Sequence, residues 1–73
     1  MKERILKILQ SVNESITDGA NLIDEGIVDS FEVVNIVMEL EEAFDIEIEA
    51  ENVVPENFKT VDAIVALVEK IIG

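Results

Sequence analysis

Residues 29–44 of the chain read DSFEVVNIVMELEEAF, the clearest helical pattern in the sequence. Asp29 is a favourable N-cap for a helix, and Glu32, three residues later, completes the pattern of a capping box. The apolar residues that follow recur at intervals of three and four, which is the spacing of one helix face. We therefore predict a helix that begins at Ser30 and runs to about Phe44.

Steps of 100° per residue divide the apolar residues of this helix between two stripes. The first stripe should face the core and contains Val33, Ile36, Val37, Leu40 and Phe44. The second stripe lies roughly 120° away, on the side that Ser30 borders. It contains Phe31, Val34 and Met38. Glu41 falls on this second stripe, with Glu42 and Asn35 along its rim. Two interpretations stay open: the segment after the helix covers the stripe, or the stripe is a docking surface for a partner protein, in which Met38 gives adaptability.

Two further helices are predicted on either side of this stretch. Apolar periodicity places one over about Lys2–Glu14, and another from an N-cap at Thr60 to about Ile72. The long loop before Ser30 carries apolar residues that should pack back onto the core. These are Leu22, Ile23, Ile27 and Val28.

Residues 44–51 alternate between apolar and acidic side chains, as a strand does. A lone strand would leave its backbone groups unpaired, and the chain offers no second strand candidate. We therefore predict an extended link, a short helical turn near Glu49–Val53, and an approach to the last helix anchored by Pro55 and Phe58. The predicted fold is all-α: a small four-helix bundle of three longer helices and one short helix, forming a single domain over residues 1–73.

The composition excludes several classes of protein. The chain has no Cys, so it has no disulfide framework, no thiol nucleophile and no zinc cluster. It has no run of about 18 apolar residues, so insertion into a membrane is not expected. The N-terminal residues lead into a helix without a signal-peptide cleavage site. We expect a monomeric protein in the cytoplasm.

The charge of the chain is strongly negative and unevenly distributed. Its formal net charge is −12, and between Ile8 and Phe58 there are 14 Asp and Glu residues but no Lys, Arg or His. Nucleic acid would be repelled, because its binding depends on cationic side chains that replace phosphate counterions. An acidic surface instead attracts proteins that carry basic docking patches.

Ser30 has no catalytic apparatus of its own. The chain contains no His, so a Ser-His-acid triad is impossible, and it contains no G-x-S-x-G elbow. We therefore predict that the protein is not an enzyme, and that any reaction at Ser30 is activated by another protein.

The acidic loop before Ser30 does not match a calcium-binding loop. If Gly26 held the glycine position of an EF-hand, Ile23 would occupy a ligand position that it cannot fill. No metal site is predicted.

With these residues in view, the chain resembles the acyl and peptidyl carrier proteins of the stand-alone, phosphopantetheine-binding type. The resemblance rests on Asp29-Ser30-Phe31, which is similar to the attachment motif of that family. It continues through Val34, through residues 37–44, and through Thr60-Val61 at the start of the last helix. Phe31 replaces the Leu or Met usual in the motif, and residues 54–58 lengthen the link. Both features look more like specialised carriers, including those loaded with amino acids or polyketide starters.

The resemblance implies a function and a set of site residues. Ser30 would carry a covalent 4'-phosphopantetheine, attached from coenzyme A by a phosphopantetheinyl transferase. Acyl or aminoacyl cargo would be bound to this arm as a thioester, for fatty acid, polyketide or aminoacyl transfer. Loading and downstream enzymes with basic patches would bind a surface on the second helix. The surface would consist of Asp29, Phe31, Val34, Met38, Glu41 and Glu42. The alternative is an unmodified acidic helical module that binds a basic partner protein through this helix.

Overall fold

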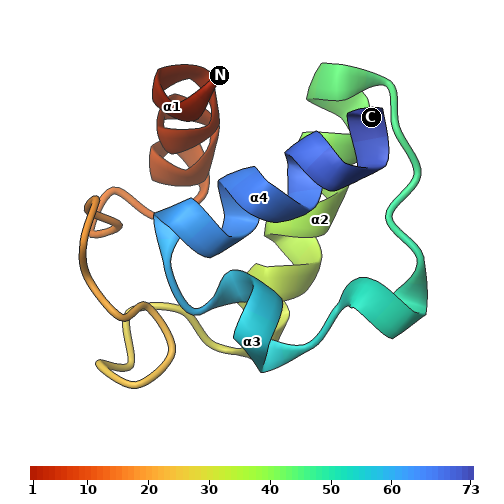
Figure 1. Ribbon diagram of the computed structural model, residues 1–73. Coiled ribbons are helices and arrows are strands. Elements are labelled where there is room, and N and C mark those ends of the chain that lie inside the picture. The colour runs from red at the N-terminus through yellow and green to blue at the C-terminus, as the bar shows by residue number, and fades with distance from the viewer.

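The computed structural model describes residues 1–73, which form four α-helices and one 3-10 turn and no strand. The elements are α1 (Lys2–Val12), α2 (Ser30–Phe44), η1 (Ala50–Asn52), α3 (Pro55–Phe58) and α4 (Val61–Ile72). In Figure 1, α1 stands beside α2, α4 crosses in front of α2, and the short α3 lies below them. The predicted all-α bundle of three longer helices and one short helix is confirmed.

The N-caps that the sequence predicted for α2 and α4 both form. Asp29 Oδ1 accepts a hydrogen bond from the backbone N–H of Glu32 at 2.9 Å, and Thr60 Oγ1 accepts one from that of Ala63 at 3.0 Å. These bonds satisfy N–H groups that the first turn of a helix leaves free. The predicted bounds of α2, from Ser30 to Phe44, are confirmed.

The reciprocal half of the predicted capping box does not form. Glu32 does not turn back to Asp29; its Oε1 instead accepts a hydrogen bond from Asn13 Nδ2 at 3.1 Å. Asn13 is available because α1 ends at Val12, two residues before the predicted end. The backbone of Asn13 is extended, and its Oδ1 accepts a hydrogen bond from the N–H of Ser15, which closes a local turn in place of another helical residue.

The link between α2 and α4 contains one helix more than the sequence predicted. The short turn expected near Glu49–Val53 is the 3-10 turn η1. The segment from Pro55 to Phe58, expected only to anchor the chain, is itself the one-turn helix α3. Pro55 occupies the first turn, where its fixed φ suits a helix and its missing N–H leaves no bond unmade. Phe58 at the other end is fully buried.

The core contains only apolar residues, drawn from the long helices, the loop and the link. Of the predicted core stripe of α2, Ile36 and Leu40 are fully buried. Val33, Val37 and Phe44 are partly buried and pack against the core. The loop before Ser30 packs back as predicted, with Leu22 and Val28 buried and Ile23 and Ile27 packed against them.

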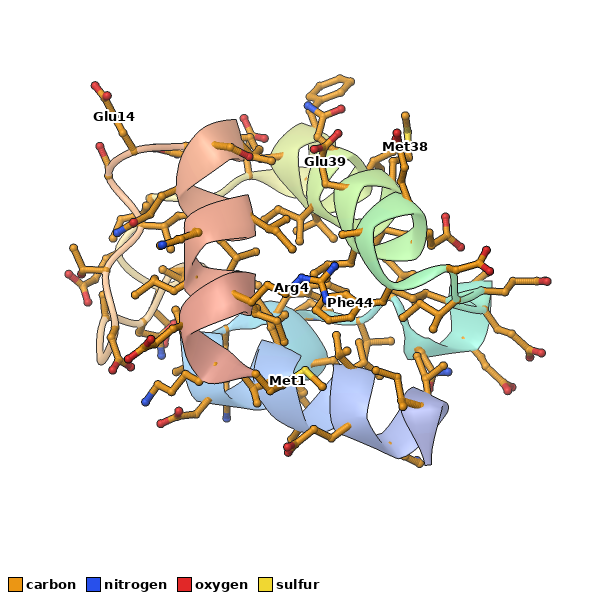
Figure 2. The ribbon with its side chains drawn as sticks, turned by 90° about the horizontal axis from the view of Figure 1, so that it is seen from above. Met1, Arg4, Glu14, Met38, Glu39 and Phe44 are labelled. Carbon is orange, nitrogen blue, oxygen red and sulfur yellow. The ribbon has the colours of Figure 1, made fainter.

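Two cations near the N-terminus connect α1 to distant parts of the chain. Lys2 Nζ lies 2.9 Å from Asp18 Oδ2 and 2.8 Å from Asp62 Oδ1. Arg4 donates a hydrogen bond to the carbonyl oxygen of Ala43 at 2.7 Å, and its guanidinium carbon lies 4.4 Å from the centre of the Phe44 ring. Figure 2 shows the side chains of Arg4 and Phe44 next to each other. Arg4 thus supplies a positive charge to the C-terminal end of α2, where carbonyl groups are left free.

None of the helices combines the length and the apolar character that a membrane span requires.

Candidate functional site

Ser30 is the first residue of α2 and is exposed to solvent. The cap made by Asp29 fixes the helix start, so the hydroxyl of Ser30 is held at the positive end of the helix dipole. An anionic group attached to this hydroxyl would lie next to backbone N–H groups that point out of the helix.

Asn13 holds the chain on both sides of Ser30. Its Nδ2 donates to the carbonyl oxygen of Ile27 at 2.7 Å and to Glu32 Oε1 at 3.1 Å. Ile27 precedes Ser30 by three residues and Glu32 follows it by two. One side chain at the end of α1 therefore fixes the loop that leads to Ser30 against the first turn of the helix. This role of Asn13 could not be predicted from the sequence, because its partners lie 14 and 19 residues away.

A cavity of about 290 Å³ lies directly beside Ser30. Its walls come from the loop, from α2 and from the segment that leads into α3. They are Ile23, Val28, Asp29, Ser30, Val33, Val34, Val53, Val54 and Pro55. All of these except Asp29 and Ser30 are apolar, so the cavity is suited to an uncharged group. The sequence could not predict it, because η1 and α3 bring Val53, Val54 and Pro55 to α2 from some twenty residues away.

The second stripe of α2 is open to solvent. Phe31 is 80% exposed, Val34 53% and Met38 57%. The link after α2 therefore does not cover the stripe, so the first of the two interpretations that the sequence left open is wrong. Glu42, Asn35 and Glu39 are also exposed and surround the apolar side chains with polar groups. We call this surface, made by Phe31, Val34, Met38 and Glu42, the α2 ridge.

Glu41 differs from the other residues predicted for this surface. Its side chain is half-buried, and its Oε2 accepts a hydrogen bond from the backbone N–H of Ile48 at 2.9 Å. The helix geometry explains the difference: Glu41 lies only about 20° from Ser30 around the axis, on the flank of the ridge that faces the link. Glu41 thus holds the link against α2 and presents less of its carboxylate to solvent than Glu42 does.

Comparisons with known proteins identify the family of the chain. The chain matches the family described as phosphopantetheine attachment site over residues 1–68. The D-alanyl carrier proteins of Bacillus cereus (strain B4264) and Bacillus anthracis (strain CDC 684 / NRRL 3495) are each 34% identical to it over 74 residues. Each of these alignments covers 96% of this chain and 94% of the relative.

The site fits the group that this family carries. A phosphopantetheine arm needs an accessible hydroxyl, a place for a phosphodiester and freedom for the rest of the arm. Ser30 is an exposed hydroxyl at a helix N-terminus, where a phosphodiester is favoured by typically about 0.3–1 kcal/mol. The adjoining cavity has room for uncharged parts of the arm. The chain therefore belongs to the phosphopantetheine-attachment family and is a carrier protein with a covalently bound 4'-phosphopantetheine.

Proposed function

We propose that Ser30 bears the arm and that the protein carries an aminoacyl group on it as a thioester, for delivery to partner enzymes. The observation that carries the proposal is the position of Ser30: exposed at the start of α2, between the apolar cavity and the α2 ridge. In the attachment step, Ser30 Oγ attacks the β-phosphorus of coenzyme A. Adenosine 3',5'-bisphosphate leaves, and the proton of the hydroxyl passes to a base of the transferase.

The chain itself supplies no base for this step. It contains no His, and the nearest carboxylate in sequence, that of Asp29, is occupied in capping α2. Ser30 is therefore an acceptor that another enzyme activates, in keeping with a carrier that is not itself an enzyme. The arm supplies a thiol to a protein that has no Cys.

The relatives named D-alanyl carrier proteins support D-alanine as the cargo. In loading, the thiol of the arm would attack the carbonyl carbon of an activated D-alanine, such as its adenylate, and release AMP. The thioester leaves the α-ammonium group of the cargo free. Because a charged ammonium group is costly to place among apolar side chains, we expect this cargo to stay in solvent, outside the cavity.

The cavity favours a second candidate, a carrier of apolar acyl groups for fatty acid or polyketide synthesis. Its apolar walls and its volume of about 290 Å³ would suit an acyl chain better than an ammonium group. The two candidates share the same arm on Ser30 and differ only in cargo.

The partner surface that we propose includes Asp29, the α2 ridge and the carboxylate of Glu41. Basic enzymes would be attracted by the long acidic region and would then contact Phe31, Val34 and Met38 directly. The attaching transferase and the enzyme that loads the cargo would both use it.

Intact-mass measurement tests the attachment. After incubation with a phosphopantetheinyl transferase and coenzyme A, the mass should rise by one phosphopantetheine. Ser30→Ala should abolish this change, whereas Ser15→Ala, at another exposed serine, should not. An unchanged mass for the parent protein, or a modified Ser30→Ala variant, would overturn the assignment.

A loading assay tests the cargo. The protein bearing the arm is incubated with ATP and a D-alanine-activating ligase, and separately with an acyl-activating enzyme and a medium-chain fatty acid. D-alanyl thioester should form faster than acyl thioester. Faster acylation would favour the second candidate and leave the attachment to Ser30 intact.

A further inference from the structure

The chain contains two methionines, Met1 and Met38, and no Cys, Trp, Tyr or His. The two thioethers are therefore its only readily oxidised side chains. Both methionines are exposed, Met38 by 57% and Met1 by 50%. Figure 2 shows Met38 projecting outward from α2. Of the two, only Met38 belongs to the α2 ridge, so oxidation of this one sulfur would alter the surface proposed for partners.

A small oxidant can reach the sulfur of Met38 from more than one side. Besides its place on the ridge, Met38 lines a hollow of about 440 Å³ between α1 and α2 that is open to solvent. The other walls of this hollow are Ser11, Val12, Asn35 and Glu39. Hydrogen peroxide is only slightly larger than water and enters an open hollow of this size freely. Burial therefore does not protect the thioether.

The surroundings of Met38 can accommodate a sulfoxide without a change of fold. Side chains of a helix lean toward its N-terminal end, so Met38 lies over Val34 and Asn35, one turn earlier. The exposed amide of Asn35 shares the hollow with Met38. Its N–H groups can donate to a sulfoxide oxygen, whereas a thioether is only a weak acceptor. Oxidation should therefore change the surface of α2 and leave the helix intact.

We infer that Met38 is a reversible oxidation site that switches off the partner surface of the carrier. The inference rests on the proposed function, because it takes the α2 ridge as that surface. Met38 Sδ attacks one oxygen of hydrogen peroxide, the O–O bond breaks, and hydroxide leaves. The transferred oxygen gives its proton to this hydroxide, which becomes water. The sulfur has then lost two electrons to the peroxide, and a methionine sulfoxide reductase returns them from thiols.

The sulfoxide would weaken short-range contact and leave long-range attraction unchanged. Phe31, Val34 and Met38 present apolar side chains to a partner, and Met38 adds an adaptable one. A partner that covers the oxidised residue would have to remove water from the S=O dipole, which is costly where no donor replaces it. The carboxylates of the chain keep their charge. The loss of rate should therefore be the same at low and at high salt.

Peroxide treatment followed by arm attachment tests the switch. The protein without its arm, and so without any thiol, is treated with hydrogen peroxide, and catalase removes the excess before transferase and coenzyme A are added. Peptide masses should show one oxygen on Met38. The value of kcat/KM for attachment should fall about fivefold or more, and reductase treatment should restore it.

Met38→Leu is the matched control, because it keeps Met1 as an oxidisable side chain. Whatever the initial kcat/KM of this variant, peroxide should change it by less than about twofold. Met38→Gln places a permanent polar group of similar length on the ridge and needs no oxidant. Its kcat/KM should be about fivefold below that of Met38→Leu. Thermal melting checks that the oxidised protein and both variants remain folded.

Several results would overturn the switch. Among them are an oxygen on Met1 but none on Met38, an oxidised Met38 with unchanged kcat/KM, and a protein that unfolds on oxidation. Equal losses in the parent protein and Met38→Leu, or equal kcat/KM for Met38→Leu and Met38→Gln, would also overturn it. The carrier function would still stand in each case. Only an untreated parent protein that gains no phosphopantetheine would remove the proposed function itself.

Discussion

Asn13 Nδ2 donates to Glu32 Oε1 at 3.1 Å across 19 residues of sequence, and this bond joins the end of α1 to the first turn of α2. The other oxygen of the same carboxylate, Oε2, is buried and has no hydrogen-bond partner. Asn13 is therefore the one polar side chain that compensates the burial of Glu32, and it also holds the carbonyl group of Ile27.

We expect Asn13→Ala to lower the free energy of unfolding by about 1–3 kcal/mol, because it leaves Glu32 and the Ile27 carbonyl without a partner. Urea denaturation measures the loss. Asn35→Ala, which removes an exposed amide from α2, is the control and should change stability by less than about 0.5 kcal/mol. Equal losses in the two variants would show that the Asn13 bond is unimportant.

The bond between Asn13 and Glu32 could not be predicted from the sequence, whereas several other features of the fold could. Periodicity and capping predicted the bounds of α2, its two stripes and the N-cap of α4, because each depends on residues within a turn or two of one another. The partner of Glu32 was predicted wrongly, because Asn13 reaches it only after α1 and α2 have packed. The helix α3 was missed for a related reason: four residues are too few to establish a helical period.

Some features of the candidate site could be predicted from the sequence and others could not. The sequence placed Ser30 at a helix start, and it put Phe31, Val34 and Met38 on a second face, but it could not decide whether that face was covered. Only the path of the link shows the face to be open. The position of Glu41 on the helix likewise did not reveal its bond to Ile48, because the link had no predictable conformation.

Glu41 and Glu42 are neighbours with different expected roles. Glu41→Ala should lower the free energy of unfolding by about 1 kcal/mol, since the Ile48 N–H loses its acceptor, and should speed hydrogen exchange at that amide. Glu42→Ala should leave stability and exchange unchanged and should lower the rate of arm attachment at low salt. Unaltered exchange at Ile48 in Glu41→Ala would contradict the role that we assign to this bond.

The contacts of Lys2 with two carboxylates should make the protein less stable at alkaline pH. Hydrogen bonds to Asp62 and then to Asp18 raise the pKa of Lys2 above its ordinary value of 10.5. A raised pKa in the folded state means that the stabilisation is fully present below pH 10.5 and is lost as the pH rises through the folded pKa. The melting temperature should therefore fall in this window by less in Lys2→Met than in the parent protein. Lys7→Met is the control, and its melting temperature should fall as much as that of the parent protein. The prediction would be contradicted if the melting temperatures of the parent protein and of Lys2→Met fell by the same amount.

Repulsion among the acids makes stability depend on salt. Because 14 carboxylates and no cations lie between Ile8 and Phe58, we expect the melting temperature to rise from about 0.02 M to about 0.5 M salt, as screening weakens the repulsion. Sodium chloride and potassium chloride should act alike, since no ion-specific site is involved. A melting temperature that does not change with salt would show that the acids are too far apart to repel strongly.

Phe31 and Phe58 should separate recognition from stability. Phe31 is 80% exposed, so Phe31→Ala should change the free energy of unfolding by less than about 0.5 kcal/mol. It should nonetheless lower kcat/KM for arm attachment about fivefold, because an aromatic side chain beside Ser30 is lost from the partner surface. Phe58 is fully buried, so Phe58→Leu should lower the free energy of unfolding by about 1 kcal/mol through imperfect repacking. Below its melting temperature, Phe58→Leu should accept the arm at the parental rate. Urea denaturation compares the stability of the two variants, and the rate of mass increase compares their attachment of the arm. If Phe31→Ala accepted the arm as fast as Phe58→Leu, the α2 ridge would not be the surface that the transferase binds.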